Sequence, residues 1–244
     1  MNNDLLLLSK NDIPFEEAQA VIHQPTIKEI AYIGEEVFFT GCELINFSKN
    51  ILLEQDKINL GDKTNFDILI AILNERNAVM QRNRDCVEIV LALIFPTYSI
   101  EIKNNFIELG EGKIVHRIDN KNFESFKKIF NEMFAFNKDN FSKDYNPSGE
   151  LAKQISEKLK KRHQKIAEIK KEKQKIDILS RYVSILAVGE RKDINQLLNY
   201  SVYQLYDEFE RFKLKMSNDI YLQAKMAGAK DLKEIEDWMK DIHS

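Results

Sequence analysis

The chain has 244 residues, of which 43% are hydrophobic and 31% are charged, and its formal net charge is −3. This balance is typical of a globular protein with a buried core and excludes an intrinsically disordered chain. The small negative net charge gives no general reason to bind DNA or a membrane surface. No apolar stretch approaches the roughly 20 residues that span a bilayer, and the short run Leu5–Leu8 follows an acidic residue, so we expect no secretory signal and a cytosolic protein.

The first 25 residues predict short strands and turns. Thr26 then forms a T-x-x-E capping box with Glu29, in which each residue satisfies a backbone N–H of the other, and this predicts the start of a helix. Pro25 stops the preceding strand. We therefore expect Pro25, Thr26 and Glu29 to be structural residues.

Further helices are predicted along the N-terminal half. Gly34 interrupts the first helix, and a second begins at Glu35. Another is opened by Thr64 with Asp67 three residues later, and the apolar helix after it ends at Pro96.

The hydrophobic period then changes. Apolar and polar residues alternate between residues 97 and 118, with turn residues between the runs, so we expect a small antiparallel three-stranded meander. A helix follows, and the polar stretch 137–149 is the predicted domain boundary. The sequence thus predicts a predominantly helical α+β fold, with an α+β N-terminal domain over 1–145 and an all-helical C-terminal domain over 146–244.

The C-terminal half predicts helices throughout. It begins with a basic helix within 150–175, followed by an apolar helix that ends at Gly189. Ser201 and Gln204 form a capping box that opens the next helix. A separate helix is predicted around 217–227, and a last one begins at Asp231.

The stretch 199–212, NYSVYQLYDEFERF, carries an aromatic ring at every third position. At about 100° per residue, rings with this spacing spiral around a helix and form no single flat platform. Acidic residues on the other side would repel the phosphates of a nucleic acid. We therefore expect most of these rings to pack in the core, and two alternatives stay open: contact with a protein partner through Tyr203 and Tyr206, and stacking on bases.

Residues 150–175 carry ten Lys or Arg and four Glu, a net charge of +6. The simplest interpretation is that these residues form a helix whose charged side chains are exposed to solvent. The alternatives are an acidic protein partner or a nucleic acid, and no aromatic residue interleaves the basic run, which weakens nucleic-acid recognition. The basic residues proposed for partner contact are Lys160, Lys161, Arg162 and Lys165.

The sequence offers no motif for catalysis or metal binding. Its four histidines are scattered, and Cys42 and Cys86 are far apart in apolar contexts, so we expect buried thiols and no metal site. The GEGK stretch at 110–113 reads as a hairpin turn. We therefore expect no enzyme and no cofactor.

Two stretches resemble a known group of proteins. IHQPTIKEIAYIGEEVFF, residues 22–39, resembles the Q-P-T-[IL]-x-E-I-x-x-x-G-E pattern of tail-gene proteins in phages of Gram-positive bacteria, and residues 199–212 resemble a pattern near their C-termini. The basic helix and IDILSRYVSILAV are also similar, so the resemblance runs in order over about 20–215. Such proteins are taken to be tail assembly chaperones.

The resemblance implies a non-enzymatic, virus-encoded protein of the host cytoplasm that is absent from the mature virion. Its partner would be the tape-measure or tail-tube protein, with self-association as a further expectation. The matched positions supply no catalytic residue, and Gln24 and Gln204 among them look structural. The alternatives are a nucleic-acid-binding phage protein that uses residues 153–175, and a structural component of the virion tail.

Overall fold

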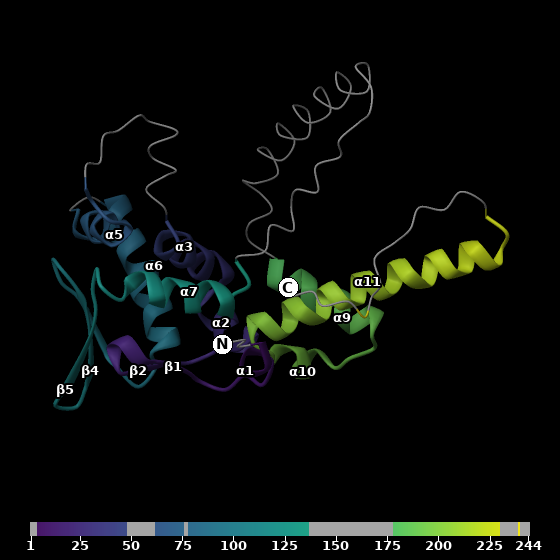
Figure 1. Cartoon of the computed structure of the whole chain (residues 1–244), viewed down its shortest axis with the longest axis horizontal. Helices are drawn as coiled ribbons and strands as arrows, with labels where there is room; N and C mark the ends of the chain where they lie inside the picture. Colours follow the sequence, from purple (N-terminus) through teal and green to yellow (C-terminus); the bar gives the residue numbers. More distant parts are fainter. Residues whose placement is uncertain (1–3, 48–61, 76–77, 137–177, 230–238, 240–244) are drawn as a thin grey trace, which may run out of the picture.

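The computed structural model describes residues 4–47, 62–75, 78–136, 178–229 and 239 (Figure 1). Helices dominate, with small antiparallel sheets in the N-terminal half and helices in the C-terminal part, which confirms the predicted fold class. The predicted boundary near residue 145 lies outside the described residues. The division into two domains therefore stays a prediction.

The N-terminal segment differs from the prediction of strands and turns alone. Residues Asp4–Leu8 form helix α1, and only then do the expected strands follow. They are β1 (Ile13–Phe15) and β2 (Ala20–Ile22), joined by the short 3-10 helix η1 (Glu16–Ala18). The strands pair antiparallel, with Ile13 opposite Ile22. The end of the hairpin is tied to the helical body, because the His23 N–H donates to the Ile94 carbonyl oxygen at 2.8 Å.

Four helices form the body of the N-terminal half: α2 (Ile27–Ile33), α3 (Glu35–Ile45), α5 (Asn65–Asn74) and α6 (Ala78–Ile94). Gly34 separates α2 from α3 with a φ of 88°, a left-handed conformation that favours glycine. Helices α3 and α6 cross closely at Gly41, where a Cβ would lie 2.6 Å from the Cys86 carbonyl oxygen.

The predicted meander is confirmed. Strands β3 (Ser99–Ile102), β4 (Ile107–Glu111) and β5 (Ile114–Ile118) form one antiparallel sheet in the order β3-β4-β5, and the GEGK stretch makes the β4–β5 turn. Helix α7 (Phe123–Met133) follows and packs aromatic side chains into the core. The sheet lies at the end of the molecule opposite to the tip of the last described helix (Figure 1).

The C-terminal part contains α9 (Ile178–Gly189), α10 (Ile194–Leu198) and the long helix α11 (Val202–Met226). The two helices expected over 201–227 are thus one. The buried core is continuous from the N-terminal half into these helices, because Leu186, Leu197 and Leu205 belong to the same cluster as the phenylalanines of α3 and α7.

The capping boxes predicted at Thr26 and Ser201 are formed, and Thr64, the predicted cap of α5, forms a third with Asp67. Each depends on residues only three positions apart, so local sequence decides it. The helix predicted to begin at Asp231 lies outside the described residues. Both cysteines are buried and unpaired, as expected, and burial raises the pKa of the Cys42 thiol well above its usual value.

Candidate partner-binding surface

Two helix starts meet where the N- and C-terminal parts join. Thr26, the N-cap of α2, and Ser201, the N-cap of α11, form an isolated antiparallel bridge. The Ile27 N–H donates to the Tyr200 carbonyl oxygen at 2.9 Å. The two stretches that carry the resemblance to tail-gene proteins are therefore in direct contact, and this contact fixes where α11 leaves the body.

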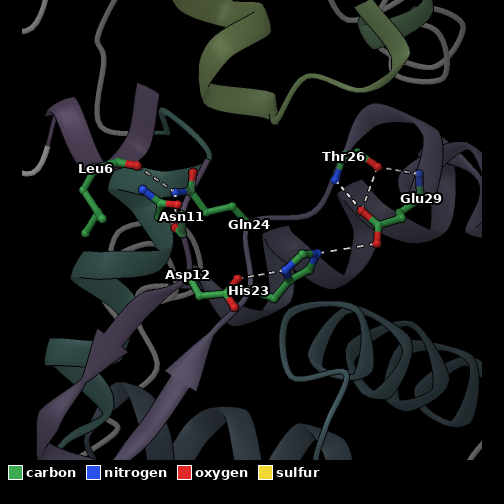
Figure 2. Close-up of polar contacts among 7 residues, drawn as sticks. All are labelled: Leu6, Asn11, Asp12, His23, Gln24, Thr26 and Glu29. Carbon is green, nitrogen blue, oxygen red and sulfur yellow. Dashed lines mark hydrogen bonds and ion pairs between the residues drawn. The ribbon is translucent and has the colours of Figure 1, made fainter. Parts of the chain in front are cut away.

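Gln24 holds the chain just before this junction (Figure 2). Its side chain is fully buried, and Nε2 donates to the carbonyl oxygens of Leu6 at 3.2 Å and Asn11 at 2.6 Å. The amide thereby ties α1 and the loop after it to the residues that precede α2. These two hydrogen bonds give Gln24 a structural role.

His23 connects the hairpin to the first capping box (Figure 2). Its Nδ1 lies 3.0 Å from Asp12 Oδ1, and its Nε2 lies 3.5 Å from Glu29 Oε1. The Thr26 backbone N–H and hydroxyl both donate to Glu29 Oε2 at 2.7 Å. Burial raises the pKa of the Glu29 carboxyl, but the hydrogen bonds from Thr26 and the nearby His23 outweigh it and hold this pKa below its usual value.

Helix α1 clamps the first turn of α11. Gln204 Nε2 donates to the Leu8 carbonyl oxygen at 2.6 Å, so this capping residue also binds a distant segment. The Tyr203 hydroxyl donates to Asp4 Oδ1 at 3.0 Å, and the Tyr203 side chain is only 3% exposed. Contact of Tyr203 with a protein partner was one of the alternatives that the sequence left open. In the structure the protein itself covers this ring, so Tyr203 is not available for such a contact.

Aromatic packing fixes the next turns of α11 against α9. Tyr182 stacks on Phe209 with ring centroids 3.9 Å apart, and it meets Tyr206 edge-on at 5.6 Å. Burial, followed by the neighbouring Tyr206, raises the pKa of the Tyr182 hydroxyl far above its usual value. These rings pack on α9 in the protein, as expected of a core, and Tyr206 remains half-exposed beside them.

A groove of about 480 Å³ opens beside these turns. Three of its lining residues are contacted by Lys192: the Lys192 ammonium contacts the Glu208 carboxylate, lies 3.6 Å from Glu190, and donates to the Tyr200 hydroxyl at 3.3 Å. Arg211 lies 3.5 Å from Asp207, so this pair is also compensated within the groove. The contacts of Lys192 connect α11 to the segment after α9. We therefore assign the groove a structural role.

The cover on α11 ends at Phe212. Helix α9 ends at Gly189, and a Cβ on Gly189 would lie 2.3 Å from the Phe212 ring. The glycine thus lets the end of α9 lie directly on this ring. Beyond this point α11 continues for fourteen residues and projects away from the body (Figure 1).

The projecting half of α11 exposes large apolar side chains. Met216 is 46% exposed, Ile220 is 61% exposed and Met226 is 88% exposed. At about 3.6 residues per turn, Met216 and Ile220 continue the face that Leu205, Phe209 and Phe212 bury nearer the body. Met226 and Leu222 lie to one side of this face, and the exposed Asp219 lies between them and Met216. We call Met216, Ile220, Leu222 and Met226 the distal stripe. An uncovered apolar stripe of this kind is typical of an interaction site.

The sequence did not identify this surface. The signal was present, because positions 205, 209, 212, 216 and 220 follow helical spacing. The polar residues Ser217, Asn218 and Asp219 favoured a break between two helices instead. Lys160, Lys161, Arg162 and Lys165, predicted to contact a partner, lie outside the described residues.

Within the part of the chain that the structure describes, no three or more His, Cys, Asp or Glu side chains gather in a way that could hold a metal ion. No helix among the same residues is both long and apolar enough to cross a membrane.

Residues 170–243 match the family model described as the YomV second domain, which relates this part of the chain to phage proteins. The matched range contains all of α9, α10 and α11, and hence the distal stripe. The match covers less than a third of the chain. No curated protein and no solved structure matches the chain.

Proposed function

We propose that this protein is a non-enzymatic tail assembly chaperone of a phage, and that the distal stripe of α11 holds an apolar helical segment of a tail component. The observation that carries the proposal is the projecting half of α11, with Ile220 61% exposed on a helix whose first turns are buried. The match of residues 170–243 to the YomV second domain supports a phage context. The client we propose is the tape-measure protein or the tail-tube protein.

The surface suits such a client physically. A long helical tape-measure protein has apolar stripes that need cover until assembly, and an amphipathic helix binds by laying that face against a complementary apolar one. Two of the four distal-stripe side chains are methionines, whose flexible thioethers adapt to irregular partners. In this proposal the protein acts in the host cytoplasm and leaves before the virion is complete.

Co-elution tests the proposal. Purified tape-measure or tail-tube fragments should co-elute with the full chain and stay soluble only in its presence. The variant Ile220→Glu should lose this binding, because a carboxylate replaces an apolar contact. Tyr32→Glu should keep it, since Tyr32 is 82% exposed on α2 and is not part of the distal stripe. Equal binding by the wild type and both variants would contradict the placement of the binding site on the distal stripe of α11.

Two other outcomes would replace the proposal. If the basic residues 153–175 bound duplex DNA, the affinity would fall by about 0.9 log units per log of salt for each phosphate neutralised. Tight, salt-sensitive DNA binding without co-elution of a tail protein would favour a nucleic-acid-binding phage protein. Detection of the chain in purified virions by mass spectrometry would favour a structural tail component.

A further inference from the structure

We infer that the outer edge of β5 is a second interaction surface, which binds an extended segment of a partner protein with an acidic residue on each side of an apolar one. The sheet lies at the end of the molecule away from the distal stripe (Figure 1), so the inference goes beyond the proposed function and does not rest on it. The free backbone groups of this edge, its exposed side chains and the charges at its two ends support it.

The backbone of β5 is unpaired on one side. The sheet order is β3-β4-β5, and no strand among the described residues pairs with the other side of β5. Its turn to β4 has two residues, which Glu111 and Ile114 flank. In such a hairpin the flanking residues exchange hydrogen bonds, and every second pair after them does so too. Val115 and Arg117 therefore direct their backbone N–H and C=O groups away from β4.

Asn122 covers one end of this edge. Its side chain donates to the Arg117 carbonyl oxygen at 2.8 Å and accepts the Asp119 N–H at 2.9 Å. The N–H and carbonyl oxygen of Val115 and the N–H of Arg117 are left, and no described residue bonds to them. A strand laid along the edge would satisfy all three groups. It would also cover apolar side chains, because Ile114 is 60% exposed and Val115 is 49% exposed.

Two cations stand at the ends of the edge. Lys113 lies in the turn and Arg117 lies near the other end, both are exposed, and neither forms an ion pair with a residue that the structure describes. Glu108 lies opposite Arg117 on β4, but its carboxylate lies 2.7 Å from the Lys103 ammonium. Lys103 also holds Glu101 at 3.3 Å. These two acids therefore leave the cations of the edge uncompensated.

The other carboxylates near the edge have partners as well. Glu111 Oε2 lies 3.6 Å from His116 Nε2, and Asp119 accepts the Lys121 N–H at 2.8 Å. The edge thus offers an incoming strand an apolar side chain between two cations. A strand with an acidic residue two positions before and two positions after an apolar one complements this pattern.

The same edge disfavours a second copy of this chain as the occupant. If Val115 of two copies paired about a two-fold axis, Lys113 of each copy would lie opposite Arg117 of the other, and like charges directly opposite each other destabilise a sheet. Pairing of Val115 with Arg117 would need the Arg117 carbonyl oxygen, which already accepts from Asn122. The occupant is therefore a different, acidic chain.

Peptide titration of the nitrogen-15-labelled full chain, followed by NMR, tests the inference. The probes are two peptides of about nine residues with a central valine, which glutamates flank two positions away in one peptide and lysines in the other. The glutamate peptide should shift the amide signals of Val115 and Arg117 and bind about tenfold more tightly, an amount that two exposed ion pairs supply. N-methylation of its central valine should weaken binding at least about fivefold, because a backbone hydrogen bond is lost.

Variants of β5 give the matched comparisons. Val115→Pro removes an outward N–H and no hydrogen bond to β4, so it should abolish binding, whereas Val115→Thr keeps the N–H and should retain it. Lys113→Glu with Arg117→Glu should invert the preference between the peptides. Lys28→Glu with Lys128→Glu, the same charge change at exposed positions outside the sheet, should not.

Three outcomes would overturn the inference: equal affinity for the two peptides, binding that neither Val115→Pro nor the N-methyl group weakens, and a dimer joined through β5. The N-methylated peptide keeps the test independent of how the variants fold, since it uses the wild-type protein. Ile220→Glu, which changes the distal stripe, should bind the glutamate peptide as the wild type does. Failure of the proposed function is thereby distinguished from failure of this inference.

Discussion

Thr26 and Ser201, far apart in the sequence, pair in an antiparallel bridge at the N-terminal ends of α2 and α11. Each side chain also accepts the N–H of the third helical residue of its own helix, so each residue serves a local cap and a long-range contact. The bridge connects the N-terminal and C-terminal parts of the chain at the position that fixes the direction of α11. Mutations at the two sites should therefore not act independently.

We expect Thr26→Ala and Ser201→Ala each to lower the free energy of unfolding by about 1 kcal/mol, the usual cost of a lost N-cap. The double variant should deviate from the sum by about 0.5 kcal/mol or more, because the residues touch. Urea denaturation measures this.

Thr64 provides the control, because it forms the same kind of capping box on α5, away from Ser201. Thr64→Ala combined with Ser201→Ala should be additive within about 0.5 kcal/mol. Additive behaviour of the Thr26 and Ser201 pair as well would show that the bridge carries no coupling.

The second prediction concerns the end of α9. Gly189→Ala would place a Cβ 2.3 Å from the Phe212 ring, so the ring or the helix end must move. Such overpacking costs about 1–3 kcal/mol, measured as a lower free energy of unfolding. Val188→Ala, at the adjacent position with an 81% exposed side chain, should change stability by less than about 0.5 kcal/mol. Similar costs at both positions would refute the close contact.

A third prediction reverses the ranking that the sequence gives for two rings of α11. Because Phe209 falls on the same helical face as Leu205 and Phe212, and Tyr203 falls beside that face, the sequence predicts a larger cost for Phe209→Ala, about 3–5 kcal/mol. In the structure Tyr203 is the more deeply buried, and its hydroxyl bonds to Asp4. We expect Tyr203→Ala to destabilise at least as much as Phe209→Ala, and Tyr203→Phe to cost about 1 kcal/mol. If Tyr203→Ala left the melting temperature unchanged, the Tyr203 side chain would not be buried as the structure shows.

The comparison of Tyr203 with Phe209 shows which features could be predicted from the sequence and which could not. The capping boxes and the meander follow from residues a few positions apart, so local pattern decides them. The burial of Tyr203 depends on α1, which lies at the other end of the chain and which the pattern of leucines alone did not identify. The distal stripe likewise becomes a surface only because α9 stops at Gly189 while α11 continues.

The fourth prediction concerns acid stability. The Glu29 pKa is held below its usual value of 4.5 in the folded protein. A depressed carboxyl pKa contributes stability that is fully present above the unfolded pKa and is lost as the pH falls through the folded one. The free-energy difference between wild type and Glu29→Gln should therefore be constant near neutral pH and shrink as the pH falls below about 4.5. Denaturation across this range checks it, and a difference that grows with acid would have the wrong sign.

We propose that the distal stripe holds a tail protein, and cross-linking in phage-producing cells tests this proposal most directly. A photo-reactive amino acid replaces Ile220 on the stripe, and in a matched variant it replaces the exposed Tyr32 on α2. After illumination, mass spectrometry identifies what is attached to each position. We predict that position 220, and not position 32, is joined to an apolar helical segment of the tape-measure or tail-tube protein. Adducts of neither protein at position 220, or the same tail-protein adducts at both positions, would contradict the account.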